Sequence, residues 1–205
     1  MEQKYIYVVF ASTPYKIGRM IRKVTGETYN HACIALDSNL EQMYGFARRY
    51  YRTPFYGGFV KESVSRYHIN GRSADIRVCR FPITPEQSST LESHLKEMLR
   101  RQDTYLYNHL SALTLPFRRR VNIRDAYICV DFVVDILHSV GIPLDAGRNY
   151  SVSELEALLR PYAVYTGPAP EAKVYDTTYF APKPVPHPVI TTALAFMELV
   201  ERLFE

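Results

Sequence analysis

Short apolar runs separated by turn residues occupy the first part of the chain and predict β-strands. We expect strands over residues 5–10, 29–36 and 40–46, a loop entering a strand over 53–60, and a further strand over 75–81. The runs at 29–36 and 40–46 flank a turn cluster at residues 37–39, so they predict a β-hairpin.

Apolar residues at helical spacing dominate the second part, where the pattern changes from strand to helix. Thr84-Pro85-Glu86-Gln87 is a capping box, and it predicts a helix that runs to about residue 102. Further helices are predicted over 105–115, over 126–140 with Gly141 as the stop, and over 151–159.

One helix is expected among the early strands. Ser12-Thr13-Pro14 offers a hydroxyl cap and a proline at the first helical position, and Gly26 ends the segment. Its apolar positions recur at helical spacing: Ile17, Met20, Ile21 and Val24.

Early strands and late helices predict an α+β fold for residues 1–165. Prolines crowd residues 167–188, so residues 166–205 are predicted to form a proline-rich arm that ends in an amphipathic helix over 190–204. We expect that helix to pack on the domain; a partner protein or a membrane surface is the alternative.

The composition is that of a soluble folded protein, with 47% apolar and 22% charged residues. No run of about 18 apolar residues is present, which predicts no transmembrane segment. The N-terminal apolar run is too short for a signal peptide and the three cysteines have no pairing pattern, so we expect a cytoplasmic protein without a disulfide framework.

The net charge of +4 is mildly basic, and Arg118-Arg119-Arg120 with Arg124 forms the densest cluster. A solvated loop is the favoured interpretation, and attraction of an anionic substrate or lipid head groups is the alternative. No motif of known spacing indicates nucleic-acid binding.

Cys129 is the candidate nucleophile. It precedes Phe132 and Val133 by three and four residues, which places it on the apolar face of the 126–140 helix, and it lies in the first turn. There the free N–H groups and the helix dipole favour a thiolate and are able to stabilise an oxyanion. The competing interpretation is a small core residue.

His31 is the candidate base, at the start of an apolar strand. Cys33 shares its strand face because side chains two residues apart point the same way. If that face meets the Cys129 helix, a small residue at position 33 allows the close approach that a Cys–His dyad needs.

Two segments resemble the circularly permuted branch of the NlpC-type papain-like superfamily, the YiiX-like group related to lecithin:retinol acyltransferase. Residues 30–36 are similar to its His-leading strand, and residues 127–133 are similar to its Cys-x-x-Phe-Val helix start, in the permuted order with His31 before Cys129. The resemblance covers about residues 5–165. It implies a papain-like fold, with a small antiparallel sheet packed against the Cys-bearing helix.

The resemblance also implies a third polar residue that pairs with the imidazole, on the strand after the histidine. That place falls near Gly45, which has no side chain; Glu41, Tyr44, a backbone carbonyl or a water are the alternatives. Glu62 follows the Gly57-Gly58 pair and is interpreted as a solvated strand end rather than as a cleft residue.

These patterns predict a cysteine-dependent hydrolase in which Cys129 attacks an amide or ester carbonyl and His31 acts as base and acid. The resemblance implies a peptide, an isopeptide, a cell-wall amide or a lipid acyl group as substrate, and no cofactor. Acyl transfer and an inactive binding or scaffold module remain alternatives. A zinc site from His31, Cys33, Cys79 and Cys129 is disfavoured, because no Cys-x-x-Cys pair is present.

Overall fold

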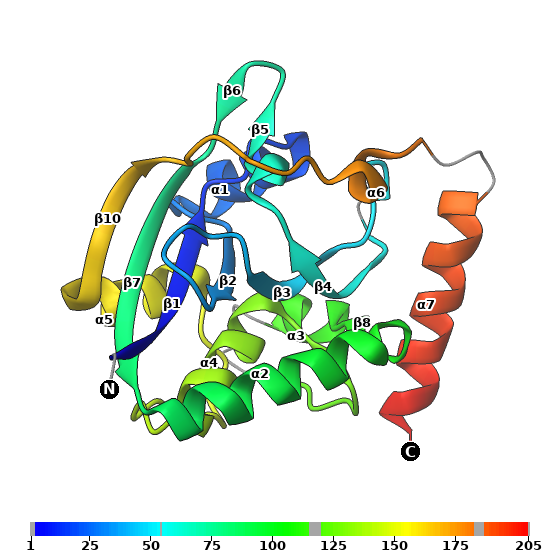
Figure 1. The fold of residues 1–205 in the computed structure, drawn as a ribbon. Coiled ribbons are helices and arrows are strands. Elements are labelled where there is room, and N and C mark those ends of the chain that lie inside the picture. Colours follow the sequence, from blue (N-terminus) through cyan, green and yellow to red (C-terminus); the bar gives the residue numbers. More distant parts are fainter. Residues whose placement is uncertain (1–2, 54, 115–119, 183–186, 205) are drawn as a thin grey trace.

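The computed structural model describes residues 3–53, 55–114, 120–182 and 187–204 (Figure 1). It combines a six-stranded antiparallel sheet with several helices, which confirms the mixed α and β composition of the predicted fold. The sheet order is β10-β7-β1-β2-β3-β4. Its strands are β1 (Lys4–Ala11), β2 (His31–Ala35), β3 (Met43–Arg48), β4 (Gly57–Glu62), β7 (Asp75–Ile83) and β10 (Ala163–Pro168).

Four shorter strands lie outside this sheet. They are β5 (His68–Ile69) with β6 (Arg72–Ser73), and β8 (Leu106–Tyr107) with β9 (Ala126–Tyr127). The helices are α1 (Lys16–Thr25), α2 (Pro85–Arg100), α3 (His109–Thr114), α4 (Cys129–Ser139), α5 (Val152–Leu159), α6 (Thr177–Phe180) and α7 (His187–Leu203).

Both faces of the central strands β1, β2 and β3 are buried, because helices cover one face and loops cover the other, whereas the edge strand β10 is exposed. On the first face, α2 and α4 pack against alternate strand residues such as Val8, Ile34 and Phe46. Figure 1 shows α2, α3 and α4 together on this side. On the second face, the residues of the opposite parity, such as Val9 and Cys33, form a separate cluster.

Local capping residues set several helix ends. Thr84 forms the predicted reciprocal capping box at α2, and Ser151 forms another at α5. Gly26 ends α1 with a φ of 71°, in the left-handed region that glycine tolerates. The predicted hydroxyl cap of α1 is wrong, because the helix begins after Tyr15, which makes no side-chain cap.

The segment predicted as a proline-rich arm begins inside the sheet. β10 pairs antiparallel with β7 at the sheet edge, so the predicted boundary at residues 165/166 falls within a strand. After β10 the chain crosses the second face, where Ala169 is buried, and reaches α6 (Figure 1). The proline-rich residues 183–186 lie outside the described residues.

Helix α7 stands at the edge of the molecule and packs through one side (Figure 1). Its Leu199 is buried, and the Arg202 guanidinium donates to the carbonyl oxygens of Thr104 and Arg124 at 2.9 and 3.1 Å. The predicted amphipathic helix therefore contacts the domain. Within the described ranges, no helix combines the length and apolar character needed to cross a membrane.

Candidate active site

Cys129 is the first residue of α4, after the extended residue Ile128. The apolar stripe of α4 packs against β2 and β3 and fixes this helix end at the sheet. The entry to the helix is held by β8 and β9, which pair in parallel through Leu106–Ala126 and Tyr107–Tyr127. Cys129 is 5% exposed and lies in the first turn of α4, where backbone N–H groups have no partner within the helix.

His31 begins β2 and lies where the sheet opens. Strands β2 and β3 pair only at Ile34–Tyr44 and Ala35–Met43, whereas β3 pairs with β4 along its whole length. β2 and β3 therefore separate towards His31, which lines the same cavity as Cys129. The structure thus brings together the two residues that the sequence singled out.

Glu62, the last residue of β4, supplies the third polar group. Its carboxylate Oε1 lies 2.8 Å from the Nε2 atom of His31, and the side chain is 3% exposed. The interpretation of Glu62 as a solvated strand end is therefore wrong. Glu41 is exposed and pairs with Lys173, and Tyr44 packs on the opposite face against Phe59, so neither alternative reaches the imidazole.

The missing side chain at Gly45 is what lets Glu62 reach across β3. A Cβ atom at position 45 would lie 2.7 Å from Glu62 Oε1 and 2.9 Å from Cys33 Cβ. Both distances are below van der Waals contact, so this position needs glycine for close approach rather than for a special φ. Gly45 therefore makes room for the third residue.

The charges of His31 and Glu62 shift the pKa of both groups. Burial lowers the pKa of His31, but the Glu62 charge and hydrogen bonds with Cys129, Cys33 and Glu62 outweigh it and hold that pKa well above its usual value. Burial raises the pKa of Glu62, yet the His31 charge and hydrogen bond, Arg66 and Tyr67 together hold it below its usual value. Each member of the pair therefore favours the charged form of the other.

Tyr67 and Cys33 complete the hydrogen-bond network around Glu62. The Tyr67 hydroxyl donates to Glu62 Oε2 at 3.2 Å and lies 3.6 Å from Cys33 Sγ. Cys33 faces the second core cluster, away from α4, so the expectation that its strand face meets the Cys129 helix is wrong. Ala32 and Ile34 face α4 instead.

A cavity of about 250 Å³ lies in front of the dyad. Cys129 and His31 line it together with aromatic and basic side chains from β3, the β3–β4 loop, β8, α6, the residue before α1 and the turn after β4. The aromatic and basic lining residues include Tyr15, Arg48, Phe55, Arg66, Tyr107 and Tyr179. A cavity of this kind, mostly apolar with a few polar groups at one point, is typical of a small-molecule or side-chain binding site.

Tyr107 is a site residue that the sequence did not indicate. Burial, followed by the charges of Cys129 and Asp131 and a hydrogen bond with the Cys129 side chain, holds the pKa of Tyr107 well above its usual value. Its hydroxyl therefore keeps its proton beside the sulfur and is able to donate it to a developing oxyanion. Two-residue strands such as β8 give no periodic signal, so only the structure reveals this neighbour.

The four residues weighed for zinc do not converge. Cys79 lies in the middle of β7, in the first core cluster. Among the described residues, ligand atoms of His31, Cys33 and Glu62 do come within 4.8 Å of one another. In this group Glu62 is already paired with His31 at 2.8 Å and with the Tyr67 hydroxyl at 3.2 Å.

The basic cluster is only partly described. Arg118 and Arg119 lie outside the described residues. Arg120 forms ion pairs with Asp135 at 2.8 Å and Asp131 at 3.5 Å, so it stabilises α4.

Comparison of the chain with protein-family models, with curated proteins and with solved structures gave no match. The case for a function therefore depends on the geometry of this site.

Proposed function

We propose that this protein is a cysteine-dependent hydrolase or acyltransferase, with Cys129 as nucleophile, His31 as acid and base, and Glu62 as the residue that orients His31. The observation that carries the proposal is the meeting of a helix-start thiol with an imidazole that is ion-paired to a buried carboxylate, at the wall of a cavity. The order of the His strand and the Cys helix agrees with a permuted papain-like arrangement.

The proposed reaction begins with an amide or ester carbonyl in the cavity. The Cys129 sulfur attacks the carbonyl carbon, and the C=O electron pair moves to the oxygen, near the Tyr107 hydroxyl and the N–H groups of the α4 start. His31 gives its proton to the leaving nitrogen or oxygen as the bond to carbon breaks, which leaves an acyl-thioester. Neutral His31 then takes a proton from water or an acceptor amine, which attacks the thioester and frees the thiolate.

Glu62 keeps the proton on the Nε2 side of the ring. Because Nε2–H is directed to Glu62 Oε1, Nδ1 is the nitrogen that exchanges protons with the sulfur and the leaving group. The Tyr67 hydroxyl holds the second carboxylate oxygen and so limits rotation of the Glu62 side chain.

Alkylation with iodoacetamide, followed by peptide mass spectrometry, tests the proposal. The native protein should be modified at Cys129 before Cys33 and Cys79, which are completely buried and act as internal controls. The variant His31→Ala should slow this modification by at least tenfold, because the proposed base for the thiol proton is removed. Cys129→Ser should abolish hydrolysis of para-nitrophenyl esters.

Equal protection of all three thiols until the protein unfolds would contradict the proposal. In that case Cys129 would be a core residue, and the fold would serve as a binding or scaffold module.

A further inference from the structure

Arg48, the last residue of β3, lines the cavity and is held there by uncharged groups. Its guanidinium carbon lies 4.0 Å from the centre of the Tyr15 ring. Nη2 donates to the Tyr179 hydroxyl at 3.0 Å, and Nη1 donates to the Tyr51 carbonyl oxygen at 3.2 Å. The side chain is thus positioned before any ligand arrives.

The other charged groups of the cavity wall cancel in pairs. Arg66 forms an ion pair with Asp176 at 2.7 Å, and His31 is paired with Glu62 at 2.8 Å. His109 Nε2 lies 2.8 Å from the carbonyl oxygen of Phe55, and burial lowers the pKa of this ring, which disfavours its charged form. Arg48 has no carboxylate within 4.0 Å among the described residues, so the cavity carries one uncompensated positive charge.

Helix α1, which contributes one residue to the cavity wall, is also positively charged. Gly18 lines the cavity, and the helix carries four cationic residues and no acidic one. These residues are Lys16, Arg19, Arg22 and Lys23. A one-signed field beside a cleft attracts ligands of the opposite charge.

We propose that the cavity binds an anionic oxygen group of the substrate, a carboxylate or a phosphate, on Arg48, while the reacting carbonyl lies at Cys129. The guanidinium has five N–H donors in a planar fork, and its two hydrogen bonds leave donors free for bidentate contact. This assignment deepens the proposed function and depends on it. The substrate class is therefore an amide or ester whose acyl or leaving group carries a negative charge.

Two activated esters test the assignment. One is the para-nitrophenyl monoester of glutaric acid, whose acyl chain ends in a carboxylate, and the other is the uncharged para-nitrophenyl ester of pentanoic acid. In the wild type, kcat/KM for the charged ester should exceed that for the neutral ester by about tenfold or more. Arg48→Gln should remove most of this preference, because it should lower kcat/KM for the charged ester far more than kcat/KM for the neutral ester.

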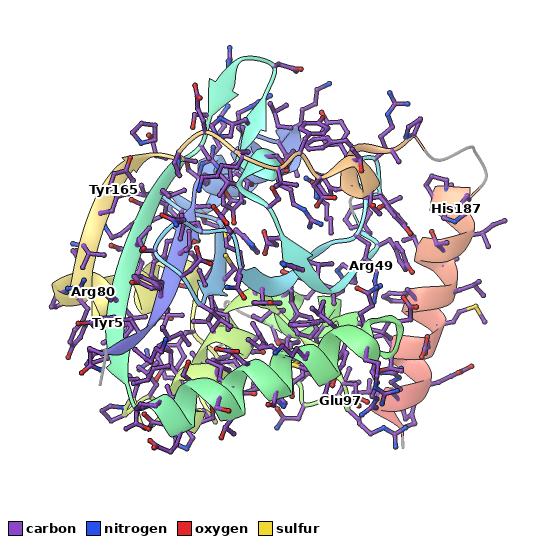
Figure 2. The ribbon with its side chains drawn as sticks, in the orientation of Figure 1. Tyr5, Arg49, Arg80, Glu97, Tyr165 and His187 are labelled. Atoms are coloured by element: carbon purple, nitrogen blue, oxygen red, sulfur yellow. The ribbon has the colours of Figure 1, made fainter. Side chains whose placement is uncertain are left out.

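Arg80→Gln is the matched control. The Arg80 guanidinium carbon lies 4.6 Å from the centre of the Tyr5 ring. Figure 2 shows Arg80 far from Arg49, the residue that follows Arg48 in the chain. This variant should keep the wild-type preference. Arg48→Lys keeps the charge but loses the planar fork, so it should retain an intermediate preference for the charged ester. This variant also shows whether the loss of preference in Arg48→Gln follows from misfolding.

A binding experiment separates this assignment from the proposed function. Glutarate and glycerol phosphate should each be compared with their neutral counterparts, glutaramide and glycerol, as protectants of Cys129 against iodoacetamide. If an anion protects Cys129 in the wild type and this protection is lost in Arg48→Gln, the result supports the anion site. Which of the two anions protects tells carboxylate from phosphate. Protection without Cys129-dependent turnover would refute the proposed function alone. Equal preference in the wild type and Arg48→Gln, with no selective protection, would overturn the assignment of Arg48.

Discussion

Replacing Glu62 by glutamine tests the central geometry of the site with almost no change in shape. The carboxylate accepts hydrogen bonds from His31 Nε2 at 2.8 Å and from the Tyr67 hydroxyl at 3.2 Å. An amide has one accepting oxygen and one donating nitrogen, so it cannot accept both. If the amide nitrogen faces His31, Nε2 must become the acceptor and the ring proton moves to Nδ1.

The expected effects follow from charge and tautomer. A hydrogen bond to a charged group contributes about 1.5–3 kcal/mol and a neutral one about 0.5–1.5 kcal/mol, so Glu62→Gln should lower the free energy of unfolding by about 1–2 kcal/mol. A neutral ring with its proton on Nδ1 cannot accept a proton from the sulfur. Hydrolysis of an activated ester should therefore fall by about a thousandfold to ten-thousandfold.

The pH dependence of stability is the more specific measurement. The pKa of His31 is raised in the folded protein, so its contribution is complete below its unfolded pKa of about 6.5 and is lost as the pH rises through the folded pKa. The pKa of Glu62 is lowered, so its contribution is complete above about 4.3 and is lost as the pH falls through its folded pKa. The free energy of unfolding of the wild type should exceed that of Glu62→Gln by the largest amount between about pH 4.5 and 6.5.

Urea unfolding at several pH values, with ester hydrolysis on the same samples, measures both effects. Glu92→Gln is the matched control, since Glu92 is about half exposed on α2 and forms a long ion pair with Lys96, at 3.9 Å. That variant should change the free energy of unfolding by less than about 0.5 kcal/mol. If Glu62→Gln unfolds and hydrolyses as the wild type does across this pH range, the orienting role of Glu62 is refuted.

Three further substitutions probe the surroundings of the site. Gly45→Ala should displace the Glu62 carboxylate, because the new Cβ would lie 2.7 Å from it; activity should fall towards that of Glu62→Gln, and unchanged ester hydrolysis would contradict the close approach. Asp131→Asn should stabilise the protein by about 1–3 kcal/mol near pH 8 and not near pH 3.5. The reason is that burial raises the pKa of Asp131 from 3.8 to about 6, so its ionisation is costly in the fold; urea unfolding at both pH values checks this, and equal effects would refute it. Thr84→Ala should lower the free energy of unfolding by about 1 kcal/mol through loss of the α2 cap, and a thermal melt unchanged from the wild type would show that the capping box contributes nothing.

The separation of β2 and β3 explains how residues from opposite sides of the sheet form one site. His31 belongs by strand parity to the second face, whereas Cys129 approaches from the first face. The two strands are paired only at Ile34–Tyr44 and Ala35–Met43, so neither face is closed where the dyad lies. The same separation gives access to the cavity.

The sequence determined the parts of the fold that depend on neighbouring residues. The capping boxes at Thr84 and Ser151, the left-handed stop at Gly26 and the apolar stripe of α4 are local features, and each was predicted from residues within a few positions. The sequence also indicated Cys129 and His31, because a cysteine at a helix start and a histidine at a strand start are visible in the local pattern.

Only the tertiary structure decided the third residue and the charge of the cavity. Glu62 reaches His31 across β3 because Gly45 lies between them. The pairing of strands across a sheet cannot be predicted from the local pattern of apolar and polar residues. Likewise, whether Arg48 is neutralised depends on Asp176, more than a hundred residues away, which pairs with Arg66 instead. Such long-range pairing is set by the register of strands and the path of loops. A carboxylate in a strand therefore looks solvated until its neighbours are known.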